Sequence, residues 1–262
     1  MQLEHKTIVV IGGTTGLGLS AARAFVREGA QVVVVGRNPD SGERAQAELG
    51  AGARALAGDA SHSETAPRAI ELALDEFGGF DGLYHVAGGS GRRMGDGPLH
   101  EVTDAGISAT LELNLTSLIL SNRAATLQFL RQGSGGSILN MGSVLGCNPS
   151  PQFFATHVYA ATKSAAIGFS KSCAAYYAAN NIRFNVLAPA LVETPMAKRA
   201  AEDETILAFI KTKQPLDGGR IGHPEDLDAA AVFFLSDGSK FCTGQALFID
   251  GGWMVSEGQI PG

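Results

Sequence analysis

The sequence predicts one α/β domain in which a doubly wound, mostly parallel sheet of seven strands carries helices on both faces. Short β-branched segments alternate with longer helical segments along the whole chain. The 34 glycines suit the many tight turns that such an alternation needs. No linker, repeat or low-complexity segment divides residues 1–262, so we expect a single domain.

Composition and charge narrow the classes of function that the chain is expected to serve. Its formal net charge of −6 disfavours non-specific nucleic-acid binding, which usually needs a basic surface. No apolar run reaches the roughly 18 residues of a membrane span, and the N-terminus lacks a signal-peptide pattern. Cys147, Cys173 and Cys242 are widely spaced, so we expect a cytoplasmic protein with free or buried thiols and no metal site. Packing is the favoured role for Cys147, which closely follows Ser143.

Seven short apolar segments are expected to form strands buried on both faces. They lie at residues 7–11, 31–35, 53–58, 82–87, 137–141, 182–187 and 246–249. Helices are expected between them, at residues 19–28, 41–49, 61–77, 103–133, 157–180 and 224–235. Gly29 and Gly78 mark helix ends, Pro224 suits a first helical turn, and residues 61–64 have the form of a capping box.

A glycine-rich turn, Gly12-Gly13-Thr14-Thr15-Gly16-Leu17-Gly18, joins the first strand to the first helix. Glycines let the backbone come close to a pyrophosphate, and the free N–H groups of a helix N-terminus favour its negative charge. The spacing is wider at the start than in the usual dinucleotide fingerprint. Strand, glycine turn and helix together still favour a nucleotide site over a purely structural turn.

The end of the second strand bears on cofactor choice. NAD-binding folds usually place an acid about 20 residues past the glycines, but this chain has Gly36-Arg37-Asn38 there. Gly36 leaves room and Arg37 is suited to a 2′-phosphate, so NADP(H) is favoured over NAD(H). The nearby Asp40 keeps NAD(H) open. Asp59, at the end of the third strand, would either cap a turn or bind an adenine amino group.

Tyr159 and Lys163 are the leading candidates for chemistry. Four residues apart, they share one face of a helix. A tyrosine has a reference pKa of about 10, and a neighbouring ammonium lowers it, so the pair can pass a proton to or from a substrate oxygen. Ser143, after the fifth strand, is placed to orient the same oxygen. Asn114 lies among apolar residues, so its amide is expected to have a buried partner, structural or functional.

These candidates fall where a doubly wound sheet binds ligands, at the carboxyl ends of the strands. Two further segments lie beside them. Residues 190–214 are polar, helical and interrupted, as a mobile substrate lid would be. Arg92 and Arg93 are either solvated or bind an anionic substrate group, and Phe153 and Phe154 are candidates for an apolar wall.

Taken in order, the motifs resemble those of classical short-chain dehydrogenases/reductases over nearly the whole chain. The matching motifs are Gly12-x-x-x-Gly16-x-Gly18, Asp59, Ala87-Gly88, Asn114, Ser143, Tyr159-x-x-x-Lys163, Pro189, Thr194 and Asp250-Gly251-Gly252. Three positions depart from the family pattern: Ile11 replaces a threonine, His85-Val86 replaces two asparagines, and Ala190 replaces a glycine. The local hydrogen bonding at His85 must therefore differ from that of the family.

The resemblance implies a Rossmann-type fold and a role for each matching residue. Tyr159 would donate a proton to a carbonyl or take one from an alcohol, Lys163 would bind the nicotinamide ribose and lower the tyrosine pKa, and Ser143 would hold the substrate oxygen. Asn114 would hold a water that links Lys163 to solvent. The cofactor would contact Gly12, Thr14, Thr15, Gly16, Leu17, Gly18, Arg37, Asp59, Ala60, Ala87, Gly88, Tyr159, Lys163, Pro189, Val192 and Thr194.

The leading hypothesis is an NADP(H)-dependent oxidoreductase acting on a small carbonyl compound or secondary alcohol. A catalytically silent NAD(P)-binding sensor or structural subunit is the alternative, although a binder needs no acid such as Tyr159. An epimerase or dehydratase ranks last, since such relatives are usually longer. Residues 222–252 are similar to β-ketoacyl-carrier-protein reductases, and the family likeness suggests a homotetramer or a homodimer. The substrate itself cannot be named from the sequence.

Overall fold

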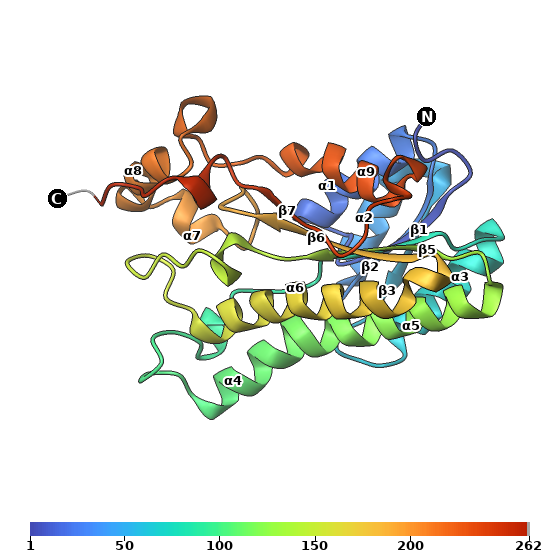
Figure 1. The fold of residues 1–262 in the computed structure, drawn as a ribbon, viewed down its shortest axis with the longest axis horizontal. Coiled ribbons are helices and arrows are strands. Elements are labelled where there is room, and N and C mark those ends of the chain that lie inside the picture. The colour runs from blue at the N-terminus through green and yellow to red at the C-terminus, as the bar shows by residue number, and fades with distance from the viewer. Residues whose placement is uncertain (261–262) are drawn as a thin grey trace.

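A computed structural model describes residues 1–260 and confirms the doubly wound sheet (Figure 1). The seven strands pair in the order β3-β2-β1-β4-β5-β6-β7, and every pairing is parallel. Their bounds are β1 (Thr7–Ile11), β2 (Gln31–Gly36), β3 (Ala53–Ala57), β4 (Gly82–His85), β5 (Gly136–Met141), β6 (Ile182–Pro189) and β7 (Ala246–Ile249). The strand order reverses direction between β1 and β4, which opens a crevice at their carboxyl ends.

Helices cover both faces of this sheet (Figure 1). One face carries α1 (Gly16–Arg27), α2 (Pro39–Leu49) and α9 (Asp228–Leu235), and the other carries α3 (Thr65–Phe77), α5 (Ser117–Gln132) and α6 (His157–Tyr177). Successive strand residues point to opposite faces. Thus Ile8 and Val10 pack into the first core, whereas Val9 and Ile11 pack into the second. This double burial explains why the strands are mostly apolar.

The long helix predicted at residues 103–133 is interrupted by a wider turn. It consists of α4 (Asp104–Leu111), a π-helical turn (Glu112–Thr116) and α5. A π turn inserts one extra residue per turn and is frequent at functional sites. Asn114 lies inside this turn.

Several helix starts differ from the sequence-based expectation, and two of them have a clear local cause. The capping box at residues 61–64 was wrong, because α3 begins only at Thr65 and Glu64 makes no capping bond. The amide and hydroxyl of Ser61 instead donate to Asp59 Oδ1, both at 2.9 Å. Helix α2 begins two residues early, at Pro39, because Asn38 Oδ1 accepts the amides of Asp40 and Ser41.

The segment after β6 forms α7 (Lys198–Ala201) and α8 (Glu204–Lys213), which stand over the carboxyl edge of the sheet (Figure 1). Ile206, Phe209 and Ile210 pack with Trp253 into a small third core. The buried Gln214 side chain accepts the Leu191 amide at 3.0 Å and donates to the Leu191 carbonyl at 3.2 Å. The two ends of this segment are thus fastened to each other. Within residues 1–260, no helix is both long enough and apolar enough to cross a bilayer.

Candidate active site

A pocket of about 470 Å³ opens at the carboxyl edge of the sheet, where the strand order reverses. It is lined by the turns that follow β1 to β6 and by α6. Most of the residues predicted from the sequence line it: Gly12, Thr14, Thr15, Gly16, Leu17, Arg37, Asp59, Ala60, Ala87, Gly88, Ser143, Tyr159, Lys163, Pro189, Val192 and Thr194. Gly18 and Asn114 lie behind this lining.

The glycine turn packs tightly against the turn after β4. Gly12 has φ +87°, and a Cβ there would lie 2.6 Å from the Ala87 amide nitrogen. A Cβ at Gly18 would lie 2.1 Å from the Gly12 carbonyl oxygen. Gly18 therefore lets α1 pack on its own turn, and its contact with a cofactor stays a prediction.

The N-terminus of α1 faces the pocket without a capping side chain. Thr15 precedes the helix in an extended conformation and makes no capping hydrogen bond. The first N–H groups of the helix are therefore available to an anion. The nearest atoms to a Cβ at Gly16 would be 3.7 Å away, on Thr194 and Pro195, so the turn leaves open space. Uncapped amides beside open space fit the pyrophosphate of a dinucleotide.

The turns after β2 and β3 bring Arg37 and Asp59 to the pocket. The room expected beside Gly36 is already filled, because a Cβ there would lie 2.2 Å from Thr14 Oγ1. Burial raises the pKa of the Asp59 carboxyl, but the hydrogen bonds from Ser61 and the Arg37 charge outweigh it and lower the pKa overall. Asp59 thus caps a turn, and its ionised carboxylate still lines the pocket.

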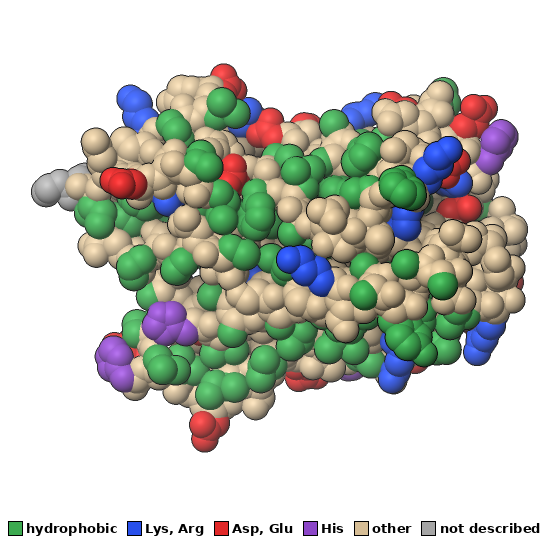
Figure 2. Space-filling model, viewed as in Figure 1, with side chains coloured by type: hydrophobic (Ala, Val, Ile, Leu, Met, Phe, Trp, Pro, Cys, Tyr) green, Lys and Arg blue, Asp and Glu red, His purple; other side chains and the backbone are tan. Residues whose placement is uncertain are grey.

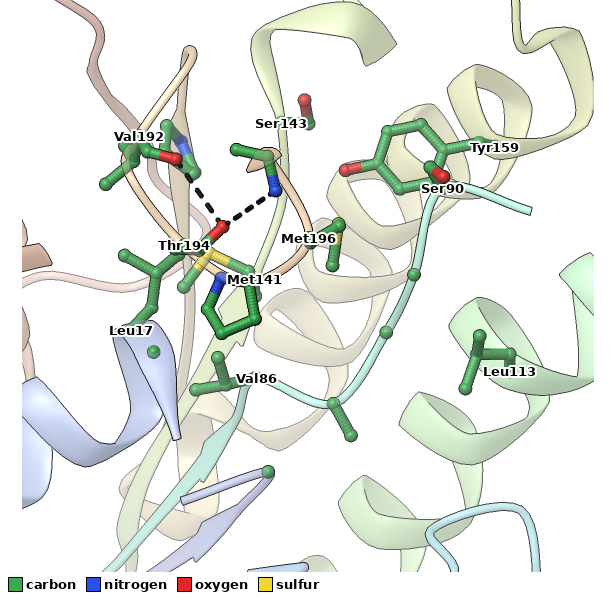
Figure 3. Close-up of a pocket in the computed structure, with 18 of the residues that line it drawn as sticks. Leu17, Val86, Ser90, Leu113, Met141, Ser143, Tyr159, Val192, Thr194 and Met196 are labelled. Carbon is green, nitrogen blue, oxygen red and sulfur yellow. Dashed lines mark hydrogen bonds between the residues drawn. The ribbon is translucent and has the colours of Figure 1, made fainter. Parts of the chain in front are cut away.

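Ser143, Tyr159 and Lys163 converge on the opposite wall. In Figure 3, Tyr159 and Ser143 lie across the pocket from Leu17, Val192 and Thr194. Lys163 Nζ donates to the Met141 carbonyl at 2.9 Å and lies 5.5 Å from the centroid of the Tyr159 ring. Burial lowers the pKa of Lys163 to about 8. Ser143 Oγ accepts the Leu145 amide, which fixes the turn after β5.

The titration of Tyr159 differs from the expectation that Lys163 lowers its pKa. Burial raises the pKa of the phenol, and the Ser143 hydroxyl acts in the opposite direction without reversing the shift. The Lys163 ammonium is directed to the Met141 carbonyl instead. In this arrangement the tyrosine is a protonated group at neutral pH.

The buried partner expected for Asn114 is the loop after β4. Its Nδ2 donates to the carbonyls of Gly89 and Thr110 at 2.9 and 3.0 Å, and its Oδ1 accepts the Gly89 amide at 3.0 Å. A Cβ at Gly88 would lie 2.7 Å from Asn114 Oδ1 and 3.6 Å from Lys163 Nζ. The amide and the ammonium therefore both lie beside the same side of Gly88.

His85 stands where the family has asparagine, and its hydrogen bonds differ from those of an amide, as expected. Its Nδ1 lies 2.8 Å from Ser121 Oγ and its Nε2 lies 3.4 Å from Ser117 Oγ, both on α5. Burial, together with the Lys163 charge, lowers the pKa of His85 to about 3. The ring is therefore neutral and joins β4 to the helix that follows the π turn.

The sequence did not single out Asp96 or Arg199. Asp96 is buried and accepts the amides of Val158 and Tyr159, so it caps α6. Arg199, on α7, lines the pocket together with Arg92. A buried acid in a loop is a usable signal for a cap, but nothing in the sequence indicates which helix it would cap.

The remaining candidate residues differ in whether they line the pocket. Arg93 does not line the pocket; Phe154 does, and Phe153 packs on Phe209 with ring centroids 5.0 Å apart. Cys147 is exposed and outside the pocket lining, so the packing role favoured for it was wrong.

Comparison with known proteins decides the family. A short-chain dehydrogenase family model, described as enoyl-(acyl carrier protein) reductase, matches residues 12–254. The chain belongs to the short-chain dehydrogenase/reductase family. Among curated members of this family, the 2,5-dichloro-2,5-cyclohexadiene-1,4-diol dehydrogenase of Sphingobium indicum is 32% identical over 96% of this chain and 98% of its own length.

Solved structures of the family agree. The 3-ketoacyl-(acyl-carrier-protein) reductase of Brucella melitensis, complexed with NADH, has a TM-score of 0.85 and 29% identity and covers 97% of this chain and 100% of its own. The gluconate 5-dehydrogenase of Burkholderia cenocepacia, in complex with NADP and tartrate, has a TM-score of 0.86 and 28% identity over 97% and 96%. This short-chain dehydrogenase/reductase is therefore an NAD(P)-dependent oxidoreductase.

Proposed function

We propose that this enzyme transfers a hydride between NADP(H) and a carbonyl compound or secondary alcohol, with Tyr159 as the proton donor and acceptor. The observation that carries the proposal is the convergence of Ser143, Tyr159 and Lys163 on one wall of a pocket whose other wall is an uncapped helix N-terminus. A bound nicotinamide would supply or accept the hydride. The remaining work is proton transfer and orientation, which belong to the protein.

The raised pKa of Tyr159 suits a general acid. At neutral pH the phenol is protonated, so it can give its proton to a carbonyl oxygen as negative charge develops there. Ser143 Oγ can donate a hydrogen bond to the same oxygen, which holds the carbonyl in place. In the oxidative direction the same two groups bind the alcohol, and Tyr159 takes the alcohol's proton after passing its own proton through Lys163 to solvent.

Lys163 is proposed to serve both the ribose and the return of the proton. One N–H of its ammonium is engaged by the Met141 carbonyl, which leaves two for ribose hydroxyls or water. A pKa of about 8 lets the ammonium exchange protons near neutral pH. Asn114 Oδ1 accepts one hydrogen bond from Gly89 and keeps a second lone pair. That lone pair is our proposed anchor for a water linking Lys163 to solvent.

The preference for NADP(H) is proposed from Arg37. Its guanidinium lines the adenosine end of the pocket, where it can pair with a 2′-phosphate. Asp59 lies close enough for its carboxylate to interact with the Arg37 charge, which weakens the attraction of Arg37 for a phosphate. The proposed contacts of the cofactor are those predicted from the sequence, with Gly18 acting through packing.

Assembly and closure are part of the same proposal. Hydrophobic side chains gather on the outer surface over α4, α5 and α6 (Figure 2), and they include Ile107, Leu111, Ile119, Leu127, Leu130 and Tyr176. Such a face is suited to pairing with a second copy, as in a homotetramer or homodimer.

Residues 190–214 would act as the lid. A cytoplasmic location agrees with the three free cysteines.

Turnover of reduced cofactor tests the proposed reaction. Purified protein would be given NADPH or NADH with a panel of ketones, diketones, keto acids, keto esters and ketoacyl thioesters. Carbonyl-dependent consumption, faster with NADPH, is the expected result. Tight cofactor binding without conversion of any carbonyl compound, or of any secondary alcohol with the oxidised cofactor, would overturn the proposal.

A further inference from the structure

The substrate end of the pocket carries two positive charges. Arg92 enters from the loop after β4 and Arg199 from α7, and both line the same pocket as Ser143 and Tyr159. Among the described lining residues, Asp59 is the only acid, and it belongs to the turn after β3 at the adenosine end. Around the two arginines the lining is mainly apolar, with Leu145, Phe154, Met196 and Trp253.

The Arg92 loop is held firmly against α6. Gly91 has φ +71°, and a Cβ there would lie 2.3 Å from Thr110 Oγ1, so the loop is pressed on α4. The Gly91 carbonyl accepts the amides of Met94 and Asp96, which closes the turn that carries Arg92. Asp96 then binds the first turn of α6. Arg92 is thus set by the same contacts that position Tyr159.

Arg199 is fixed from the other side. Its Nη2 donates to the Phe153 carbonyl at 3.3 Å, and the neighbouring Ala200 is buried in the third core. Burial lowers the pKa of Arg92, and the Arg199 charge lowers it further, against a smaller opposite effect of Asp96. Since both side chains also line the same pocket, their two positive charges act on each other.

The Asp96 carboxylate offsets only part of this repulsion, and its oxygens accept the amides of Val158 and Tyr159. Arg23, Arg27, Arg54 and Arg220 form ion pairs with carboxylates, whereas neither Arg92 nor Arg199 does so within residues 1–260. Both arginines are exposed, so water screens part of this repulsion, and an anion bound between them would relieve the rest. A carboxylate is the matching group, because guanidinium groups bind it through two parallel hydrogen bonds.

We propose that Arg92 and Arg199 form a carboxylate-binding subsite, so that the substrate is a small keto acid or hydroxy acid. The carboxylate would lie between the two arginines while the carbonyl oxygen lies at Ser143 and Tyr159. The apolar lining between these points would receive a hydrocarbon skeleton. This inference rests on the proposed function, since Ser143 and Tyr159 define where the reacting oxygen lies.

Matched acids and esters test the subsite. Acetoacetate and levulinate would be compared with their methyl esters as NADPH-dependent substrates of the wild type, Arg92→Gln, Arg199→Gln and the double variant. The wild type should prefer the acids. Each substitution should raise the KM of the acids by roughly 10- to 100-fold, which is the change expected when a hydrogen bond to a charged group is lost. It should also bring the ratio of the kcat/KM for the acid to that for the ester towards unity.

Arg93→Gln is the matched control, because Arg93 is the exposed neighbour that lies outside the pocket lining. It should leave the acid-to-ester ratio unchanged. Equal use of acids and esters by the wild type, or an unchanged ratio in the double variant, would overturn the subsite and leave the proposed reaction standing.

If the proposed reaction itself is wrong, the enzyme will turn over neither the acids nor the esters. Calorimetric titration of levulinate into the protein saturated with NADP⁺ would then decide. Binding that disappears in the double variant sustains the subsite, and no binding to the wild type overturns it.

Discussion

Asp96 Oδ2 accepts the backbone N–H of Tyr159 at 2.8 Å, and Asp96 Oδ1 accepts that of Val158 at 3.1 Å. A buried carboxylate therefore satisfies two of the free amides at the start of α6 and places a negative charge at the positive end of the helix. The loop after β4 and the helix that carries Tyr159 consequently form one unit.

Replacing Asp96 should loosen this unit. Loss of a helix cap costs about 0.5–2 kcal/mol, and Asp96→Ala also leaves two buried amides without a partner. We expect a lower melting temperature and a fall in kcat, with cofactor affinity largely kept. Asp104→Ala, in the exposed first turn of α4, is the control and should change little. Wild-type stability and kcat in Asp96→Ala would contradict the positioning role.

The cofactor preference should depend on Arg37. Arg37→Ala removes the guanidinium proposed to pair with the 2′-phosphate, so the KM for NADPH should rise by roughly 10- to 100-fold while that for NADH stays nearly constant. Initial rates with both cofactors measure this. Arg44→Ala, on the exposed side of α2, should leave both values unchanged. An equal effect of Arg37→Ala on both cofactors would refute the assignment.

Stability should fall as the pH rises through the titration of Asp228. Burial raises the pKa of this carboxyl to about 6, against the opposing effects of the Ser20 hydrogen bond and Arg27. Because the folded pKa lies above the unfolded one, folding favours the protonated form, and stability is lost between about pH 4 and pH 6. Asp228 Oδ1 is also buried without a hydrogen-bond partner among the described residues.

Asp228→Asn should therefore raise the free energy of unfolding by about 1–2 kcal/mol at pH 8 and by much less at pH 4. Urea unfolding at the two pH values measures the difference. Asp237→Asn is the control, since that side chain is exposed and pairs only with Lys6. A variant less stable than the wild type at pH 8 would show that the ionised form is the favoured one.

Gln214 should control the proposed lid. Its two bonds to Leu191 fasten the ends of the segment that carries α7 and α8. Gln214→Ala should speed amide hydrogen exchange across residues 190–214 and raise the KM of the carbonyl substrate more than it changes kcat. Gln245→Ala, whose side chain reaches only the Thr243 carbonyl, is the control. Unchanged exchange in residues 190–214 would mean that the third core alone holds the segment.

The strands and most of the pocket could be predicted because both follow local rules. Strands buried on both faces are mostly apolar, and the carboxyl ends of parallel strands share one edge, so Gly12, Asp59 and Ser143 had to lie near one another. The residues that the sequence did not single out act on segments that are distant in the chain. Asp96 caps a helix about sixty residues away, and Arg199 meets Arg92 only because α7 folds back over the sheet.

The wrong expectations have a physical cause as well. Residues 61–64 fit a capping pattern, but Ser61 is already bound to Asp59, so the helix starts later. The pKa of Tyr159 depends on burial and on where the Lys163 ammonium points, and neither follows from a spacing of four residues.

The most direct test of the account is the catalytic rate of Tyr159→Phe, measured beside its cofactor affinity. Removing only the hydroxyl should lower kcat by roughly a hundred- to ten-thousand-fold and leave the Kd for NADPH nearly unchanged. Tyr176→Phe, on the exposed face of the same helix, should behave as the wild type. A Tyr159→Phe enzyme that turns over substrate at the wild-type rate would contradict the assignment of Tyr159 as the proton donor.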